Sequence, residues 1–358
     1  MEKFNINNRR YIGNKSKLLE WIFEKIRKNT TGSSFFDVFS GTGSVSKEAL
    51  NYYDEIIIND FLFSNNVIYK AFFGNEDYDK KKLEKMAIDI NSYKYEDLEE
   101  NYFDKNFGNK YFGKRDARRI GFIREKIEIK KRENKINEKE YNILLSSLIY
   151  SIDKIANTVG HYEAYIKKSV KDDVLFFNLI KPLDTKGKNI KIFREEANKL
   201  VKKISSDIVF LDPPYNSRQY SRFYHVIENL VEWEKPELFG VALKPKEKNM
   251  SDYCRNNAPK VFNDLVKKLN CKHIAVTYNN TYNSKSSSSK NKISFEEISK
   301  SLNKVGKTKI FEKEYKFFNA GKTDFKAHKE FLFITEVKWD KWNQKLDHLF
   351  FMLVISIN

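Results

Sequence analysis

Short apolar runs alternate with amphipathic stretches over the first 70 residues of the chain. Apolar side chains recur at helical spacing over residues 17–28, which predicts a helix. The runs at 35–39 and 55–59 are short and apolar, as in buried strands, and residues 45–53 between them predict a second helix. A strand, a helix and a further strand in this order form a βαβ unit, which places its loops at one edge of a parallel sheet.

The same alternation returns in the second half of the chain. Residues 189–193 have a strand-like pattern and residues 208–211 have that of a buried strand, and residues 195–203 between them have that of a helix. Further strands are predicted at 273–277 and 331–335. The two halves together predict an α/β fold with one open, mostly parallel sheet.

A long segment separates the two halves. Residues 76–184 are rich in lysine and tyrosine and lack the alternation of strand and helix, so they predict an inserted, mainly helical subdomain. We therefore expect a sheet domain made of residues 1–75 and 185–338. Residues 339–358 form a C-terminal extension of unknown role, with an apolar run too short to cross a membrane.

The charge balance adds a partner to this picture. The chain of 358 residues has 66 lysines and arginines against 49 acidic residues, a net charge of +17 that favours a polyanionic partner. A basic surface arising only from the general abundance of lysine is the alternative. Cys254 and Cys271 make neither a disulfide framework nor a zinc spacing, and no metal is expected at the five scattered histidines. No signal peptide or membrane span is predicted, so a cytoplasmic location is expected.

The tetrapeptide Asp212-Pro213-Pro214-Tyr215 follows a run that predicts a buried strand. Polar residues at the carboxyl end of such a strand lie where open α/β sheets bind ligands. The Asp212 carboxylate and the Pro213 carbonyl can only accept hydrogen bonds, and Tyr215 offers a flat ring beside them. These groups suit a planar heterocycle with an exocyclic amine, such as a base flipped out of a duplex. An ordinary turn after a strand is the alternative.

A glycine loop follows the first predicted strand. Asp37-Val38-Phe39-Ser40-Gly41-Thr42-Gly43 has two glycines where the chain must turn sharply and let a ligand approach its backbone. The loop lacks the third glycine of a dinucleotide motif and the lysine of a P-loop, so it favours an adenosine cofactor without a phosphate. Asp60, at the end of the second strand, is placed to accept from the hydroxyls of a ribose, and a helix cap is its alternative role.

Ahead of the first strand, the segment Arg10-Tyr11-Ile12-Gly13-Asn14-Lys15 supplies a ring and a cation. Lys15 could pair with the carboxylate of an amino-acid moiety on the cofactor, and Tyr11 could cover that moiety. The alternative is the solvated start of a basic helix.

These motifs, in the order 10–15, 37–43, Asp60 and, after the insertion, 212–215, resemble the Dam-type alpha group of adenine-specific DNA methyltransferases. The resemblance covers the chain up to about Val337. It implies the Rossmann-like sheet of the class I methyltransferases that depend on S-adenosylmethionine, with the insertion as the target-recognition region.

The resemblance also implies roles for individual residues. The residues implied to bind S-adenosylmethionine are Tyr11, Lys15, Asp37, Phe39, Gly41, Gly43, Asp60, Glu196 and Asp212, with Glu195 as an alternative to Glu196. Asp212 and Pro213 are implied to accept the hydrogens of the target amine, and Tyr215 to stack on the flipped adenine. Residues 157–162 and 216–220 are similar to substrate-facing segments of some subfamilies, although His161 is more often structural in such a position.

The implied activity is site-specific methylation of adenine N6 in double-stranded DNA within a restriction-modification system. The expected chain is monomeric, and a restriction endonuclease encoded nearby is a further expected partner. Residues 109–139 hold twelve basic against five acidic residues, so cations there and after the tetrapeptide are the candidate DNA contacts: Arg115, Arg118, Arg119, Arg218 and Arg222. The alternatives are transfer to another planar amine, such as cytosine N4, an RNA base or a glutamine side chain, and an inactive relative that only binds nucleic acid.

Overall fold

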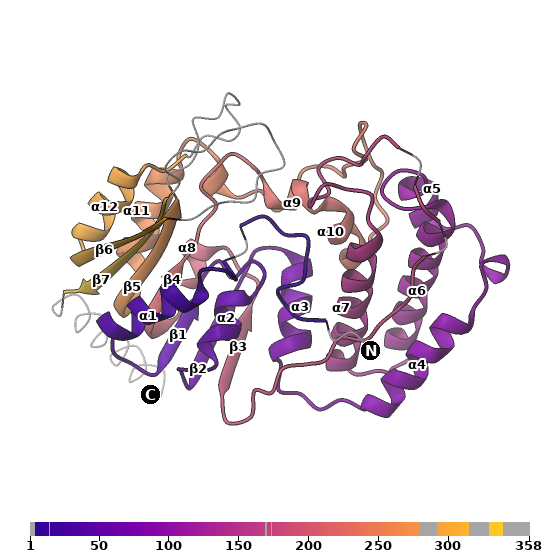
Figure 1. Ribbon diagram of the computed structural model, residues 1–358, viewed down its shortest axis with the longest axis horizontal. Coiled ribbons are helices and arrows are strands. Elements are labelled where there is room, and N and C mark those ends of the chain that lie inside the picture. The colour runs from indigo at the N-terminus through magenta and orange to yellow at the C-terminus, as the bar shows by residue number, and fades with distance from the viewer. Residues whose placement is uncertain are drawn as a thin grey trace, which may run out of the picture.

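A seven-stranded sheet organises the chain, in the order β3-β2-β1-β4-β5-β7-β6 (Figure 1). The computed structural model describes residues 4–13, 15–168, 170–172, 174–279, 292–314 and 329–338. The strands are β1 Ser34–Asp37, β2 Glu55–Asn59, β3 Asn189–Phe193, β4 Ser205–Leu211, β5 Asn270–Asn279, β6 Gly306–Glu314 and β7 Lys329–Val337. Strands β1 to β5 pair in parallel, and β7 runs antiparallel to both β5 and β6. The strand order reverses beside β1, so the loops after β1 and β4 meet at the switch point where such sheets bind ligands.

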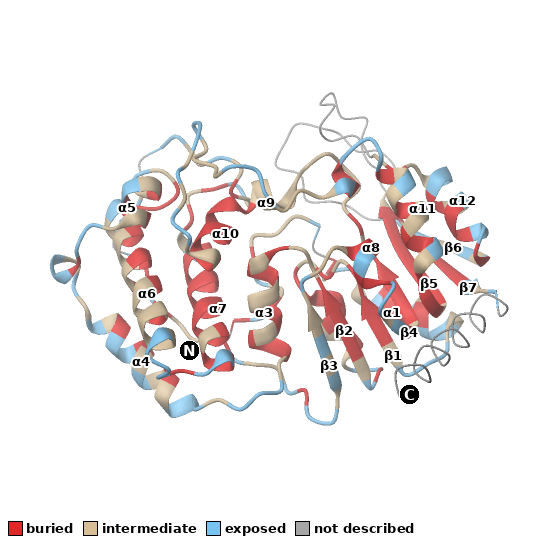
Figure 2. Ribbon diagram, turned by 180° about the vertical axis from the view of Figure 1, so that it is seen from behind, coloured by how far each residue is buried: buried red, intermediate tan, exposed pale blue. Residues whose placement is uncertain are grey.

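Helices cover both faces of the sheet because successive side chains of each strand point to opposite faces. Phe35 belongs to the core under one set of helices and Phe36 to the core under the other set. The first set is α1 Leu19–Asn29, α2 Ser44–Ala49 and α3 Phe63–Phe73. The second set is α8 Ala197–Leu200, α11 Ala258–Lys268 and α12 Phe295–Asn303, with the short η2 Asp252–Cys254 beside it. Figure 2 shows the buried strands between these layers.

A helical unit lies beyond α3 at one end of the sheet (Figure 1). Its elements are α4 Lys80–Ser92, η1 Tyr95–Asp97, α5 Tyr102–Phe107, α6 Lys114–Arg132 and α7 Glu138–Ile155, with α9 Tyr220–Phe223 and α10 His225–Glu232 joining it from the second half of the chain. Helix α7 begins with a capping box, since Asn137 Oδ1 accepts from the Glu140 N–H at 2.9 Å and Glu140 Oε2 accepts from the Asn137 N–H at 2.9 Å. Its apolar side chains share one continuous core with α3 and the sheet.

Side chains from this unit hold both ends of α3. The Lys139 ammonium donates to the carbonyls of Lys70, Ala71 and Gly74 at 2.7–2.9 Å, at the carboxyl end of the helix. Burial lowers the pKa of Lys139 to about 8. At the other end, the Glu228 carboxylate of α10 accepts from the N–H groups of Phe63 and Ser64 at 3.0 and 2.9 Å. These contacts satisfy backbone groups that a helix terminus leaves unpaired.

The structure confirms the predicted α/β fold class. The strands at 55–59 and 189–193 have the predicted bounds. Some elements are shorter: the strand expected to reach residue 39 ends at Asp37, and the helix expected to reach residue 53 ends at Ala49. Strands β4, β5 and β7 extend beyond their predicted bounds. The helix expected at 195–203 spans only Ala197–Leu200, because the Glu196 side chain caps it.

Two further outcomes concern the edge strand β6 and the domain bounds. Strand β6 was not predicted, because most of its side chains are exposed lysines and glutamates, as edge strands often have. The division at residues 76–184 stays a prediction, and the extension at 339–358 lies outside the described residues. Within the part of the chain that the structure describes, no helix is both long and apolar enough to cross a membrane.

Candidate active site

The loop after β1 turns through two glycines in left-handed backbone conformations. Gly41 has φ +52° and Gly43 has φ +78°, a region that side chains disfavour. A Cβ atom on Gly43 would lie 2.8 Å from Ile6 Cδ1, too close for an unshifted neighbour. The turn is closed by the Gly43 N–H, which donates to the Ser40 carbonyl at 2.7 Å. Both glycines are therefore required by the shape of this loop.

Asp60 ties this loop to the end of β2. Its carboxylate accepts from the Gly41 N–H at 3.0 Å and from the Leu62 N–H at 2.9 Å. The Tyr69 hydroxyl of α3 donates to the Gly41 carbonyl at 2.7 Å from the other side. Asp60 thus has a structural task at the loop, and its contact with a ribose stays a prediction.

Asp37 is a buried carboxyl below the glycine loop. Ser46 Oγ donates to Asp37 Oδ2 at 2.7 Å, whereas Oδ1 is buried without a hydrogen-bond partner among the described residues. Burial raises the pKa of Asp37 to about 7, with the carboxylates of Asp212 and Asp60 adding to the effect of burial. Their mutual influence shows that three carboxyl groups gather at the carboxyl ends of β1, β2 and β4.

Tyr11 lies against the glycine loop from the N-terminal segment. Its ring stacks on Tyr224, which lies between α9 and α10, at a centroid distance of 4.8 Å and an angle of 6°. A Cβ atom on Gly41 would lie 3.2 Å from Tyr11 Cε1, so the ring borders the loop. The Tyr224 hydroxyl accepts from the Ile12 N–H at 2.8 Å, which fixes the segment. The predicted motifs at residues 10–15 and 37–43 are thereby brought together.

Asp212, after β4, is the centre of a buried polar cluster. Its Oδ1 atom accepts from the Tyr215 hydroxyl at 2.6 Å and from Thr277 Oγ1 at 2.7 Å, and the Lys15 ammonium lies 3.4 Å away. The Lys15 ammonium also lies 3.5 Å from Glu330 Oε1. Every described contact to the Asp212 carboxylate is at Oδ1. The Oδ2 atom has no described hydrogen-bond partner and is not fully buried. One oxygen is therefore anchored, and the other is left accessible as an acceptor.

Lys15 is 7% exposed and keeps its charge through its two carboxylate neighbours. Burial acts to lower the pKa of Lys15, but Asp212 and Glu330 raise it above its ordinary value. The predicted pairing of Lys15 with a cofactor carboxylate is not tested. What the structure places beside Lys15 is the Asp212 carboxylate of the tetrapeptide.

Tyr215 is held by its hydroxyl group. This hydroxyl lies between Asp212 Oδ1 and the Thr277 carbonyl oxygen, and the ring meets Tyr278 edge-on at a centroid distance of 5.3 Å. Burial and the nearby Asp212 carboxylate raise the pKa of Tyr215 well above its ordinary value, so the hydroxyl stays protonated. Stacking of the ring on a base stays a prediction, and the hydroxyl has a role that the sequence did not indicate.

The remaining predicted cofactor residues lie on the β3 side of the site. Glu196 Oε1 and Oε2 accept from the N–H groups of Asn198 and Lys199 at 2.9 and 3.1 Å, so this carboxylate caps α8. Glu195 is tied by its backbone to the Asn59 side chain. The ring of Phe39 meets Tyr253 edge-on at 5.0 Å. Their contacts with a cofactor stay predictions.

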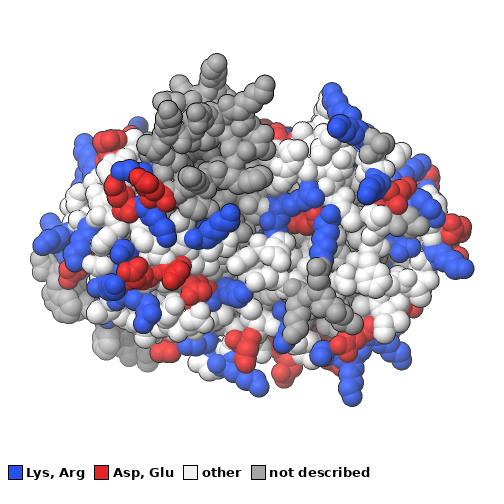
Figure 3. Space-filling model, in the orientation of Figure 1, with Lys and Arg blue, Asp and Glu red and all other residues white. Residues whose placement is uncertain are grey.

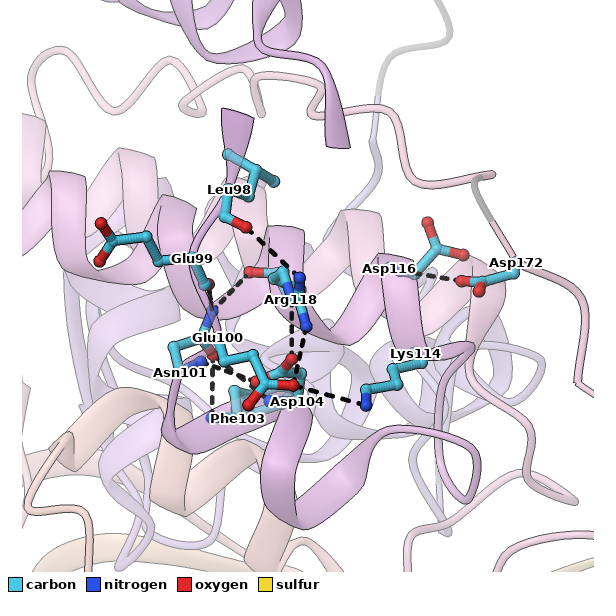
Figure 4. A network of polar contacts seen from close by, with 10 residues as sticks. All are labelled: Leu98, Glu99, Glu100, Asn101, Phe103, Asp104, Lys114, Asp116, Arg118 and Asp172. Carbon is cyan, nitrogen blue, oxygen red and sulfur yellow. Dashed lines mark hydrogen bonds and ion pairs between the residues drawn. The ribbon is translucent and has the colours of Figure 1, made fainter. Parts of the chain in front are cut away.

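The predicted arginines of α6 already have partners within the helical unit, and Figure 4 shows those of Arg118. Arg118 is mostly buried and donates from Nε to Asp104 Oδ2 at 2.8 Å and from Nη2 to Glu100 at 3.2 Å. Arg115 pairs with Glu96 at 3.1 Å, and Arg119 donates to the Tyr93 carbonyl at 3.0 Å. These contacts join α6 to the segments around η1 and α5.

Arg218 and Arg222 follow the tetrapeptide and are closer to it in the sequence than the arginines of α6 are. Arg222 Nη1 donates to the Pro245 carbonyl at 2.6 Å, and the Arg218 guanidinium lies 5.7 Å from the centroid of the Phe223 ring. Arg10, from the N-terminal motif, donates to the Thr158 carbonyl at 2.7 Å in the predicted substrate-facing segment. His161 packs against Phe223 at 4.9 Å, and burial lowers its pKa. The DNA contacts of Arg218 and Arg222 stay predictions.

Three residues of the site were missed from the sequence. Thr277 and Glu330 come from the ends of β5 and β7, and Tyr224 lies between α9 and α10. The β4 and β5 register pairs Leu211 with Val276, which puts Thr277 beside Asp212. A polar residue at the end of the strand predicted for 273–277 was the available signal.

The cluster fits a cationic adenosine cofactor of the kind that the resemblance implied. Asp37, Asp60, Asp212 and Glu330 provide four carboxyl groups at this edge, whereas Lys15 and the buried Arg9 provide two cations. The unpartnered Asp37 Oδ1 adds a buried acceptor. An excess of acceptors and negative charge suits a positively charged ligand.

The sheet order, the glycine loop and the Asp-Pro-Pro-Tyr turn together define an α/β methyltransferase fold. The family model of D12 class N6 adenine-specific DNA methyltransferases matches residues 11–330, and the chain belongs to this family. Membership of the alpha group stays a prediction.

Curated relatives are modification enzymes. The chain is 35% identical over 294 residues to modification methylase StsI of Streptococcus sanguinis, covering 76% of this chain and 44% of that protein. It is 32% identical over 290 residues to modification methylase LlaI of Lactococcus lactis subsp. lactis, covering 76% and 46%. It is 29% identical over 340 residues to type II methyltransferase M.NlaIII of Neisseria lactamica, covering 91% and 98%. The chain thus spans less than half the length of the first two relatives and nearly all of the third.

Proposed function

We propose that the protein is a site-specific DNA methyltransferase that transfers the methyl group of S-adenosylmethionine to N6 of adenine, within a restriction-modification system. One observation carries the proposal: Asp212 Oδ1 is anchored by Lys15, Tyr215 and Thr277, while every described contact leaves Oδ2 accessible. Family membership and the modification methylases among the relatives support the same activity.

The chemistry of an exocyclic amine explains why an anchored acceptor matters. The lone pair of this nitrogen is delocalised into the ring, which makes it a poor nucleophile. If Asp212 Oδ2 and the Pro213 carbonyl each accept one amine hydrogen, the nitrogen becomes more tetrahedral and its lone pair is localised. A carboxylate fixed in advance loses no energy to reorientation during the reaction. The bound cofactor supplies an electrophilic methyl group on a sulfonium sulfur.

The residues proposed to hold the cofactor surround the glycine loop. The backbone of Gly41 and Gly43 would line its pocket, Tyr11 would cover it, and Asp60 would accept from its ribose. Asp37 would provide a buried acceptor below the loop. The excess of carboxyl groups over cations supports a positively charged ligand at this position.

Duplex DNA is the proposed substrate, with the helical unit as its recognition region and a cognate restriction endonuclease as a functional partner. Figure 3 shows basic and acidic side chains mixed over one face, so the charge of +17 does not by itself mark a DNA surface on that face. Neutralising Arg218 and Arg222 is expected to flatten the salt dependence of DNA binding by up to ~0.9 log unit for each phosphate that these side chains neutralise. The triple change at Arg115, Arg118 and Arg119 tests α6 in the same assay.

The test of the activity is methyl transfer to defined duplexes, followed by analysis of the nucleosides. We expect N6-methyladenine in the product of the wild-type chain, and Asp212→Asn serves as the control that keeps the shape of the side chain. N4-methylcytosine in place of N6-methyladenine would contradict the proposed target atom. Transfer to RNA alone would contradict the proposed substrate, and modification-sensitive sequencing of host DNA would identify the recognition sequence.

A further inference from the structure

A second buried carboxylate lies on the far side of Lys15. Glu330 is the second residue of β7 and is only 5% exposed. The residues that follow it in this strand are mainly apolar. The register pairs it with Asn279, two residues beyond Thr277 on β5. Glu330 is therefore placed at the same sheet edge as the Asp-Pro-Pro-Tyr turn.

The Lys15 ammonium contacts a carboxylate of β7, Glu330, and the carboxylate of Asp212 in the turn after β4. Lys15 lies 3.5 Å from Glu330 Oε1 and 3.4 Å from Asp212 Oδ1. A buried carboxylate without a charged partner is costly, so this arrangement requires the ammonium between the two acids. Burial raises the pKa of Glu330 and Lys15 opposes this effect, as expected for an acid that shares its one cation.

We propose that Glu330 is a positioning residue of the methyl-transfer site, which holds the Lys15 ammonium against Asp212 Oδ1 and so keeps Oδ2 as the acceptor for the substrate amine. This inference rests on the proposed function. Glu330 does not itself contact the reacting atoms: it acts through Lys15. Without Glu330, Lys15 has one carboxylate neighbour instead of two, and its position no longer constrains the Asp212 carboxylate in the same way.

The experiment compares Glu330→Gln with Glu336→Gln in methyl transfer to duplex DNA. Glu336 lies on the same strand but is exposed, so it is a matched control for loss of one carboxylate from β7. We expect Glu330→Gln to lower kcat roughly 10- to 100-fold, the range for a slightly misplaced catalytic group. The KM values for DNA and cofactor should stay close to those of the wild type, and the variant should remain fully folded at the assay temperature. Glu336→Gln should match the wild type in all of these values.

The outcomes separate this inference from the proposed function. Absence of methyl transfer in the wild type would overturn the proposed function, and the inference with it. An active wild type with an unchanged kcat in Glu330→Gln, or with a change in KM alone, would overturn only the inference. Loss of activity accompanied by an equal loss of folded protein would also overturn it, in favour of a purely structural role.

A double-mutant cycle provides a readout that needs no catalysis. Lys15→Met, Glu330→Gln and the double variant are compared by denaturant unfolding, since contacting residues have non-additive effects. We expect the double variant to lose less stability than the sum of the two single variants. Additive losses would overturn the contact on which the inference depends.

Discussion

Two charged regions of this molecule differ in how fully their charges are paired within the chain. At the sheet edge, Asp212 and Glu330 share the single ammonium of Lys15, and one oxygen of Asp212 has no described partner. Along α6, Arg118 contacts Asp104 and Glu100, so this cation is paired with acids within the chain. The sheet edge retains unused acceptor capacity for a ligand. The charges of α6 are occupied in joining segments of the helical unit, and a run of arginines in a sequence does not by itself identify a binding surface.

The largest expected effect tests the acceptor at the sheet edge. Asp212→Ala removes both oxygens and leaves Lys15 and Thr277 without their shared partner. We expect methyl transfer to fall by at least roughly 10²–10³-fold, the range for loss of one electrostatic contact in a preorganised site. A tritiated-methyl assay measures this effect, and Asp54→Asn, at an exposed aspartate, is the control. Substantial residual turnover would remove Asp212 from the mechanism.

The second prediction uses the buried carboxyl below the glycine loop. Since the pKa of Asp37 is raised to about 7, the folded state binds a proton that the unfolded state releases from about pH 4 upward. The stability due to this proton is complete below about pH 4 and is lost as the pH rises through 7. The wild type should therefore lose about 3 kcal/mol relative to Asp37→Asn between these values, by the usual conversion of pKa shifts. Denaturant unfolding at several pH values measures this difference, and parallel curves would contradict it.

The third prediction concerns the matched charges of α6. Arg118→Ala leaves the buried Asp104 carboxylate without its guanidinium, so we expect the free energy of unfolding to fall by roughly 1.5–3 kcal/mol. Arg115→Ala removes an exposed pair with Glu96 and should cost only about 0–1 kcal/mol. Chemical denaturation of both variants measures the contrast. Equal losses would show that the two arginines do not differ in structural role.

The fourth prediction separates the role of the Tyr215 ring from that of its hydroxyl. Tyr215→Phe keeps the ring but removes one hydrogen bond to Asp212 Oδ1, while Lys15 and Thr277 remain. We expect activity to fall about tenfold, close to the ~1.5 kcal/mol of a weak bond to a charged group. Tyr215→Ala should lose a further ~1–3 kcal/mol if the ring stacks on a base. Equal rates of the two variants, measured with the same duplex, would contradict the stacking role.

Local patterns predicted the elements of the sheet better than its edge. The sequence patterns of β2 and β3 gave their bounds, because those strands are short and flanked by clear turns. The glycine loop and the tetrapeptide were found because their residues are adjacent in the chain. Thr277 and Glu330 were missed because they join the site only through the pairing of β4 with β5 and of β5 with β7. The partners of Arg118 were also missed. Asp104 lies on α5 and meets Arg118 of α6 only through the packing of the two helices.

Both ends of α3 depend on side chains of the helical unit. Lys139 from the start of α7 and Glu228 from α10 complete the ends of a helix that belongs to the sheet domain. A helical unit transplanted from a relative would expose three carbonyls and two N–H groups unless it brought equivalents of both side chains. The helices α3, α7 and α10 therefore depend on one another, and a change that removes both side chains would destabilise α3 together with the helical unit.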